Sequence, residues 1–268
     1  MKKQHILSIA LVCIGLFTSC NQSPIEDLSE KASKSREVIF NIGISPITRT
    51  VTDGLKSSFV SNDKIGISGI NDGTQEPITQ NQQFFYKENN TWSSTMGAIY
   101  FPEDGNSADF YAYYPFDETK KELVFDYSVA TDQSDDYNKS DFLWAKNETI
   151  ELGAKAVSLS FTHALALVEV NVTAPADETI SYVEIKANAT VTVDLKAQTA
   201  TLKAEEMSAF IKMQKLKEKP NSYRAVVPAQ MLTGRCVFIS TKEGGQYPYT
   251  LSEPMEIRAN TVNTFDIE

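Results

Sequence analysis

Residues 157–172 read VSLSFTHALALVEVNV, and apolar and polar side chains alternate along them over an unusual length. The alternation covers Val157 to Phe161 and is resumed from Val168 to Val172. A period of two residues is typical of a strand with one buried face. The parity of the apolar positions changes near His163-Ala164, which indicates a bulge or a bend. This run therefore predicts a long, once-interrupted strand in a sheet.

Shorter alternating runs recur on both sides and are separated by turn signals such as Asp53-Gly54, Asp104-Gly105 and Gly244-Gly245. They predict strands at residues 38–44, 64–70, 84–87, 98–101, 109–114, 122–127, 142–145, 180–187, 190–195, 199–203, 223–228, 236–241, 247–252 and 261–267. Residues 205–219 fit a helical spacing and a strand alternation equally well, so both structures stay open there. Strand–helix–strand repetition is missing, and the predicted fold class is therefore all-β.

A domain boundary is expected at residues 173–178, where Pro175 and two acids interrupt a strongly patterned strand. We expect two β-sandwich units, at residues 37–174 and 175–268. A length of 268 residues with 41% apolar content is enough for one large or two medium domains. The formal net charge of −10 repels nucleic-acid phosphate, which argues against nucleic-acid binding.

The N-terminal residues have the layout of a bacterial lipoprotein signal. Lys2 and Lys3 precede an apolar run from Ile6 to Phe17, and small residues lead to Cys20. We expect residues 1–19 to be a signal peptide that is cleaved between Ser19 and Cys20, with acyl chains on Cys20 that anchor the chain to the outer membrane. The polar residues 20–36 are expected to form a flexible tether. An ordinary secretory signal is the alternative.

The histidine, cysteine and acidic residues of the chain do not predict catalytic chemistry. After residue 19 the chain has a single histidine, His163, in a strand-like apolar run where a core role is favoured. Cys236 also lies in an apolar run, where cysteine usually acts as a small buried hydrophobe. The acidic residues 132–138 lack the glycine and the final acid of a calcium loop, so a solvated loop is favoured. No cofactor, no metal and no enzymatic activity are expected.

Aromatic side chains gather at residues 110–116. Exposed tyrosines on a strand can stack against sugars, and Tyr111 and Tyr113 are the candidates for glycan contact. The competing interpretation is that one parity of this strand faces the core. A surface lipoprotein that binds glycans without catalysis is therefore the alternative function.

Several segments resemble the fimbrillin-like family of Bacteroides-type fimbrial lipoproteins. They are Phe110–Pro115, Asp141–Ala145, Leu159–Ala166, Tyr223–Pro228 and Ile47–Thr50, and their order and spacing together carry the resemblance. The resemblance implies two transthyretin-like β-sandwich domains in tandem, export as a lipoprotein and incorporation into fimbriae on the cell surface.

The resemblance also implies how such subunits assemble. An Arg-specific protease cuts after the first strand, and a strand of the next fimbrial subunit fills the opened groove by donor-strand complementation. In this sequence Val38–Ile44 would be the removable strand, and the cut would fall between Arg49 and Thr50. Arg36, expected in the tether, is a competing site. Family stalk members continue beyond a segment like residues 256–267, so a tip or accessory position is expected beside the stalk position.

Overall fold

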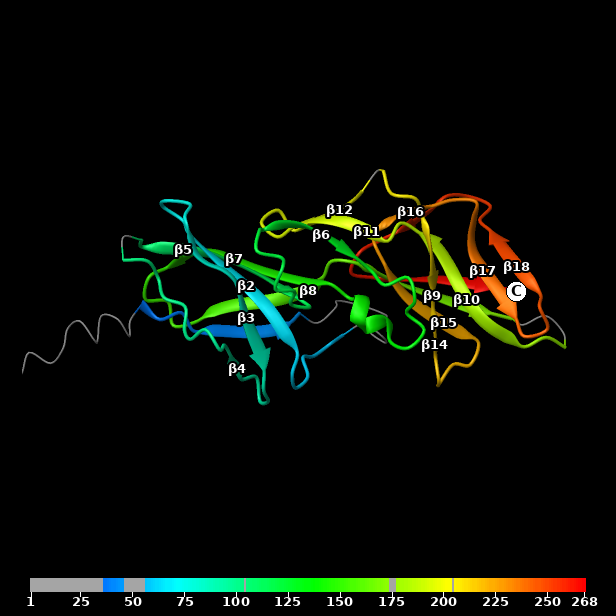
Figure 1. Ribbon diagram of the computed structural model, residues 1–268, viewed down its shortest axis with the longest axis horizontal. Helices are drawn as coiled ribbons and strands as arrows, with labels where there is room; N and C mark the ends of the chain where they lie inside the picture. Colours follow the sequence, from blue (N-terminus) through cyan, green and yellow to red (C-terminus); the bar gives the residue numbers. More distant parts are fainter. Residues whose placement is uncertain (1–35, 46–55, 104, 174–176, 204) are drawn as a thin grey trace, which may run out of the picture. The chain divides into compact units, whose positions relative to one another are not determined.

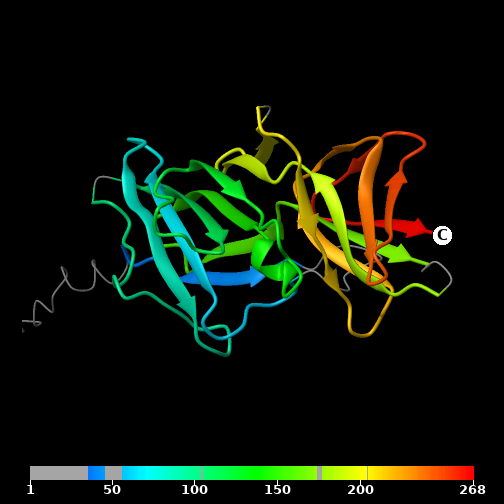
Figure 2. The same ribbon diagram turned by 45° about the vertical axis from the view of Figure 1, so that its right-hand side comes forward.

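The computed structural model describes residues 36–45, 56–103, 105–173, 177–203 and 205–268. Strands account for nearly all regular structure in these ranges (Figures 1 and 2). The strands are β1 (Phe40–Ile44), β2 (Lys64–Asn71), β3 (Pro77–Tyr86), β4 (Trp92–Ser93), β5 (Ser107–Tyr114), β6 (Val124–Ser128), β7 (Leu143–Glu151), β8 (Val157–His163), β9 (Ala166–Val172), β10 (Ile180–Ala187), β11 (Thr190–Asp194), β12 (Thr199–Leu202), β13 (Ala209–Lys212), β14 (Gln214–Lys215), β15 (Ser222–Val227), β16 (Gln230–Leu232), β17 (Arg235–Thr241), β18 (Gln246–Thr250), β19 (Met255–Ile257) and β20 (Val262–Ile267). A 3-10 helix, η1, spans Tyr137–Ser140. The all-β prediction is confirmed.

The largest sheet has the strand order β1-β8-β7-β5-β2-β3-β4. Strand β8 pairs with β7 only at its C-terminal end, through Leu143↔His163 and Trp144↔Thr162. On its other edge, residues 157–161 of β8 pair with β1. Apolar side chains of these strands form a first core, which contains Val38, Ile42, Phe59, Ile65, Ile67, Phe84, Ile99, Phe101, Ala108, Phe110, Ala112, Leu143, Ala145, Val157, Leu159 and Phe161.

Four further sheets have the orders β13-β10-β17-β18, β14-β15-β9-β20, β12-β11-β6 and β16-β19. Their buried side chains form a second core, which includes Leu167, Val183, Ile211, Val226 and Val237. Tyr111, Tyr113, Phe142 and Trp144 also belong to the second core, although they lie on or beside strands of the largest sheet. The largest sheet therefore has buried side chains on both faces at β5.

The long run 157–172 forms two strands rather than one. Strand β8 ends at His163 and β9 begins at Ala166, as the change of parity predicts. The turn between them is held where the backbone N–H of Ala164 donates to the carbonyl of Phe142 at 2.8 Å. The bend lets one continuous run pair with β1 in one sheet and with β15 and β20 in another.

The grouping of strands does not follow the expected division between residues 174 and 175. Strand β9 precedes this point yet pairs with β15 and β20, and β6 pairs with β11. The break at 173–178 is thus a connection between strands β9 and β10. The assignment of two transthyretin-like units in tandem stays a prediction.

The open choice at residues 205–219 is decided by pairing. Strand β13 pairs with β10, and β14 pairs with β15. Ile211 and Met213 are buried, whereas Phe210 and Met207 are exposed, so the alternation of period two describes this part of the chain. Within the described ranges, no helix is both long and apolar enough to cross a bilayer.

A close contact at Gly66 in β2 provides a test of the packing. A Cβ at this position would lie 2.1 Å from Oδ1 of Asn81 and 2.7 Å from a ring carbon of Tyr113. We expect Gly66→Ala to lower the free energy of unfolding by about 1–3 kcal/mol because the core is overpacked. Urea denaturation measures the change.

Gly43 in β1 is the matched control, since a Cβ there meets no atom within 4 Å. Gly43→Ala should change stability by less than about 0.5 kcal/mol. Equal effects of the two substitutions would contradict the packing at Gly66.

Candidate functional site

Strand β1 lies at one end of the strand order of the largest sheet. It runs parallel to β8, with Phe40 opposite Val157 and Ile44 opposite Phe161 (Figure 1). The flanking hydrogen bonds are short: Val157 N–H donates to the carbonyl of Ile39 at 2.7 Å, and Ser45 N–H donates to that of Phe161 at 2.8 Å. The strand is therefore fully paired on the side that faces β8.

The residues just before β1 have a different partner. Glu37 forms an antiparallel bridge with Tyr100. Val38 N–H donates to the carbonyl of Ile99, and Phe101 N–H donates to that of Arg36, both at 2.8 Å. The segment 36–45 thus binds residues 99–101 at its start and β8 along the rest of its length. We call this segment the N-terminal strand segment.

Alternate side chains of the N-terminal strand segment enter the first core. Val38 and Ile42 are buried, with Ile42 only 2% exposed, whereas Ile39 is 59% exposed. Phe40 makes edge-to-face ring contacts with Phe84 at 5.7 Å and Phe110 at 5.3 Å. The predicted alternation of this strand is confirmed.

Removing the N-terminal strand segment would uncover apolar surface and backbone groups at the same time. Val157, Leu159 and Phe161 of β8 are each at most 1% exposed. Fully burying one such side chain stabilises a protein by roughly 1.5–3 kcal/mol, and each backbone group left buried and unpaired costs roughly 1–3 kcal/mol. We call the surface that the segment covers, formed by β8 and residues 99–101, the furrow.

Arg36 belongs to the folded part of the chain. Its carbonyl accepts from Phe101 N–H, and its Nε lies 3.3 Å from the carbonyl oxygen of Phe101. The expectation that Arg36 lies in a flexible tether is therefore wrong. These backbone and side-chain bonds hold it against residues 99–101.

Ser19, Cys20, Arg49 and Thr50 lie outside the described residues. Lys56, the first described residue after residues 46–55, is fixed by its side-chain contacts. Lys56 forms an ion pair with Asp63 at 2.7 Å, and its ammonium lies 4.8 Å from the ring centroid of Tyr114. The side chains of Lys56 and Asp63 are 13% and 11% exposed. Together with Ser45, which bonds β8, Lys56 brackets the segment that contains Arg49.

His163 and Cys236 are buried. Nδ1 of His163 lies 3.0 Å from Oδ1 of Asp141, and both side chains are nearly inaccessible. Burial raises the pKa of the Cys236 thiol, which opposes formation of the thiolate nucleophile. Both residues are placed as expected for core positions.

The acidic residues 132–138 contact strand β15 through Gln133. Asp132 and Asp136 accept hydrogen bonds from Ser134 N–H and Asn138 N–H two residues later. Between them, Gln133 is buried and exchanges two hydrogen bonds with the backbone of Val226, both 2.8 Å long. Within the described ranges, histidine, cysteine and carboxylate side chains form no group of three suited to a metal ion.

The glycan platform at Tyr111 and Tyr113 is not available. Tyr111 is 0% and Tyr113 is 2% exposed. The Tyr111 hydroxyl donates to Glu148 at 2.9 Å, and that of Tyr113 donates to the carbonyl of Asp117 at 2.8 Å. Burial also raises the pKa of Tyr113 to about 12. Glycan contact at these two tyrosines is ruled out because both faces of β5 are covered, one by each core.

Two features of this region were not expected from sequence. The pairing of residues 36–38 with 99–101 joins two segments whose strand character could be predicted but whose partnership could not. The Lys56–Asp63–Tyr114 cluster gives no motif, since its three members are scattered along the chain.

A family model described as fimbrillin-like matches residues 48–268. The chain belongs to the fimbrillin-like family. The match begins after β1, so the N-terminal strand segment lies outside the matched residues.

Individual relatives share between 13% and 27% of their residues with this chain. A candidate fimbrium tip subunit of Bacteroides ovatus, Fim1C, is 27% identical over 194 residues, which cover 63% of this chain and 35% of that protein. The chain therefore spans about a third of the length of this curated relative. The fold is similar to that of a candidate cell adhesion protein from Bacteroides uniformis, with a TM-score of 0.65, 18% identity, and coverage of 87% of this chain and 93% of that one. A second candidate cell adhesion protein, from Bacteroides ovatus, has a TM-score of 0.66, 13% identity, and coverage of 86% and 90%.

Substitution of Ile42 tests the furrow beneath β1. We expect Ile42→Ala to lower the free energy of unfolding by about 2–5 kcal/mol, because it leaves a cavity against β8. The neighbouring Asn41→Ala, at an exposed position, should cost less than about 0.5 kcal/mol. Chemical denaturation of both variants measures the difference. A tolerated Ile42→Ala would mean that β1 fills no furrow.

Reactivity of Cys236 tests its burial. A maleimide added at pH 8 should label Cys236 in the folded chain only as fast as the chain opens, and immediately in urea. Peptide mapping by mass spectrometry distinguishes Cys236 from the other cysteines. Fast labelling of Cys236 in the folded chain would contradict the core position.

Proposed function

We propose that this chain is a structural subunit of cell-surface fimbriae whose N-terminal strand segment is exchanged for a strand of a neighbouring subunit. The observation that carries the proposal is the way residues 36–45 fill a furrow of the first core. Membership of the fimbrillin-like family supports the fimbrial role. The segment acts as a placeholder that keeps the subunit folded until assembly.

The parallel pairing of β1 with β8 favours exchange. A strand in a hairpin is tied to its partner by a short turn, but parallel neighbours need a long connection. Strand β1 is joined to the rest of the chain on its C-terminal side through residues 46–55. Cleavage in that connection leaves β1 held by non-covalent contacts alone.

Arg49 is the proposed cleavage position, with Thr50 as the new N-terminus. Arg36 is a poorer substrate because its carbonyl and its guanidinium are both engaged with Phe101. A protease needs an extended, accessible backbone, and the bonded residues around Arg36 would have to open first. Cleavage at Arg49 also separates the segment from the body, whereas cleavage at Arg36 does not.

The proposed pathway begins at the outer membrane, with acyl chains on Cys20 after removal of residues 1–19. Cleavage at Arg49 then releases the body from this anchor. An incoming strand replaces the lost hydrogen bonds and apolar contacts together, as in other β-strand additions. Tip, accessory and stalk positions all fit this pathway, and no catalytic role is assigned.

Limited digestion of the precursor with an Arg-specific endoprotease tests the cleavage position. N-terminal sequencing should find Thr50 at the new terminus. Arg49→Lys should abolish this product, and the matched Arg36→Lys should leave it unchanged. Cleavage at Arg36 with Arg49 intact would contradict the proposal.

Strand exchange is tested on the cleaved protein with a fluorescent peptide of residues 36–45. The peptide should bind and increase the fluorescence anisotropy. The same peptide with Ile42→Asp should bind at least roughly 10-fold more weakly, because a carboxylate would have to enter the first core. Equal binding of both peptides would show that the furrow does not select the strand.

A further inference from the structure

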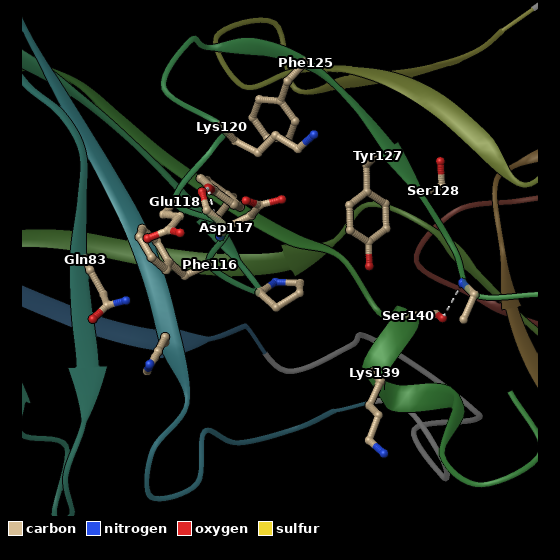
Figure 3. A pocket seen from close by; sticks show the side chains of 14 residues that line it. Gln83, Phe116, Asp117, Glu118, Lys120, Phe125, Tyr127, Ser128, Lys139 and Ser140 are labelled. Carbon is tan, nitrogen blue, oxygen red and sulfur yellow. Dashed lines mark hydrogen bonds between the residues drawn. The ribbon is translucent and has the colours of Figure 1, made fainter.

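A cavity of about 660 Å³ lies beside β6 (Figure 3). It is bordered by the start of β2, by β3, by β6, by the end of η1 and by the connection of residues 115–120 between β5 and β6. This volume lies in the range of pockets that take small molecules. None of its described lining residues belongs to residues 36–45, so strand exchange leaves its walls in place.

Two aromatic rings of β6 form one wall of the cavity. Phe125 and Tyr127 point to the same side of the strand, and both contact the buried ring of Phe142 behind them. The centroids of Tyr127 and Phe142 are 4.7 Å apart. Because the rings are supported from behind, this wall is preformed. A rigid aromatic wall suits the apolar face of a sugar ring.

The hydroxyl of Tyr127 is available to a ligand. Figure 3 shows the ring of Tyr127 upright, with its hydroxyl pointing into the space above Ser140 and Lys139. Within the part of the chain that the structure describes, this hydroxyl makes no hydrogen bond. A tyrosine hydroxyl is protonated at neutral pH and can donate, and burial raises its pKa further.

The charged side chains at the cavity differ in whether they already have partners. Asp117 accepts hydrogen bonds from the backbone N–H and the hydroxyl of Thr119, at 2.9 and 2.7 Å, and these bonds lower the pKa of its carboxyl. In the described ranges, none of Lys64, Lys120 and Lys139 takes part in an ion pair. With Glu118 as the other acid, three lysines and two carboxylates line the cavity, whereas the whole chain has a net charge of −10.

We propose that this cavity binds an acidic saccharide, with the sugar ring against Phe125 and Tyr127 and the carboxylate held by Lys64 and Lys139. The Tyr127 hydroxyl and the Gln83 amide would bond the ring hydroxyls. An aromatic wall alone would suit any apolar group, and lysines alone any anion. The combination with uncommitted hydrogen-bonding groups selects a ligand that has all three features.

The test uses saturation-transfer NMR and calorimetry on the uncleaved chain. The probes are D-glucuronic acid and N-acetylneuraminic acid, with D-glucose as the neutral comparison. Both acids should bind, and glucose should bind at least roughly fivefold more weakly, as expected for the loss of an exposed ion pair. Binding of glucose with equal affinity, or failure of both acids to bind, would overturn the proposal.

Three variants locate the site. Lys64→Ala and Lys139→Ala should each weaken glucuronate binding roughly two- to fivefold. Tyr127→Phe, which keeps the ring and its packing, should weaken it roughly three- to tenfold. Near-ultraviolet circular dichroism checks that each variant is folded. Undiminished binding by all three would place the saccharide elsewhere and overturn the assignment.

Lys155→Ala is the matched control, because Lys155 is an equally exposed lysine in the turn between β7 and β8. It should bind glucuronate as the unaltered chain does. A loss of binding in this variant equal to that of Lys139→Ala would indicate a non-specific effect of net charge and would overturn the proposal. Strand exchange measured with the 36–45 peptide should be unchanged in Lys139→Ala, so the two proposals fail independently.

Discussion

The structure depends on the parallel pairing of two consecutive strands with partners from distant parts of the chain. Strand β8 pairs with β1, and β9 pairs with β20, and both pairs are parallel. Both partners lie at the ends of their strand orders. Because β8 and β9 are separated only by the turn at Ala164-Leu165, one continuous run of the chain holds together two sheets and two cores.

This arrangement is compatible with the proposed exchange of the N-terminal strand segment. The N-terminal strand segment packs against the first core although β1 lies at the end of its sheet, since Val38, Phe40 and Ile42 pack among buried rings and aliphatic chains. By contrast, no short turn joins β1 to its partner β8, because the two strands are far apart in the chain. Stability therefore depends on the furrow and the segment together, and the proposed exchange requires a strand with the same alternation.

Burial of β5 on both faces has consequences for both proposed sites. Phe110 and Ala112 belong to the first core, and Tyr111 and Tyr113 belong to the second. The tyrosines that the sequence presents most prominently are therefore structural. Strand β6, which pairs with β11 beyond the largest sheet, supplies the accessible rings instead. Its partial exposure follows from its position over the second core and beside the cavity (Figure 3).

Much of the local structure follows from the amino-acid sequence alone. The alternation at 180–187 predicts β10 at its observed bounds, the parity change at His163-Ala164 predicts the bend, and Val38, Phe40 and Ile42 predict the buried face of β1. These features are local, because side-chain direction in a strand depends only on the residue's place in the period of two. The sequence leaves helix and strand open at residues 205–219, since short apolar runs satisfy both periods.

Only the tertiary structure decided which strands are neighbours. The partnership of β1 with β8 and residues 99–101, the crossing of β9 into the sheet of β15 and β20, and the covering of β5 on both faces all join residues far apart in the chain. Alternation shows that a face is buried but not by what, because every apolar strand face is compatible with many others. The choice among them is made by packing of the whole chain, which also decides the surroundings of Tyr111, Tyr127 and Arg36.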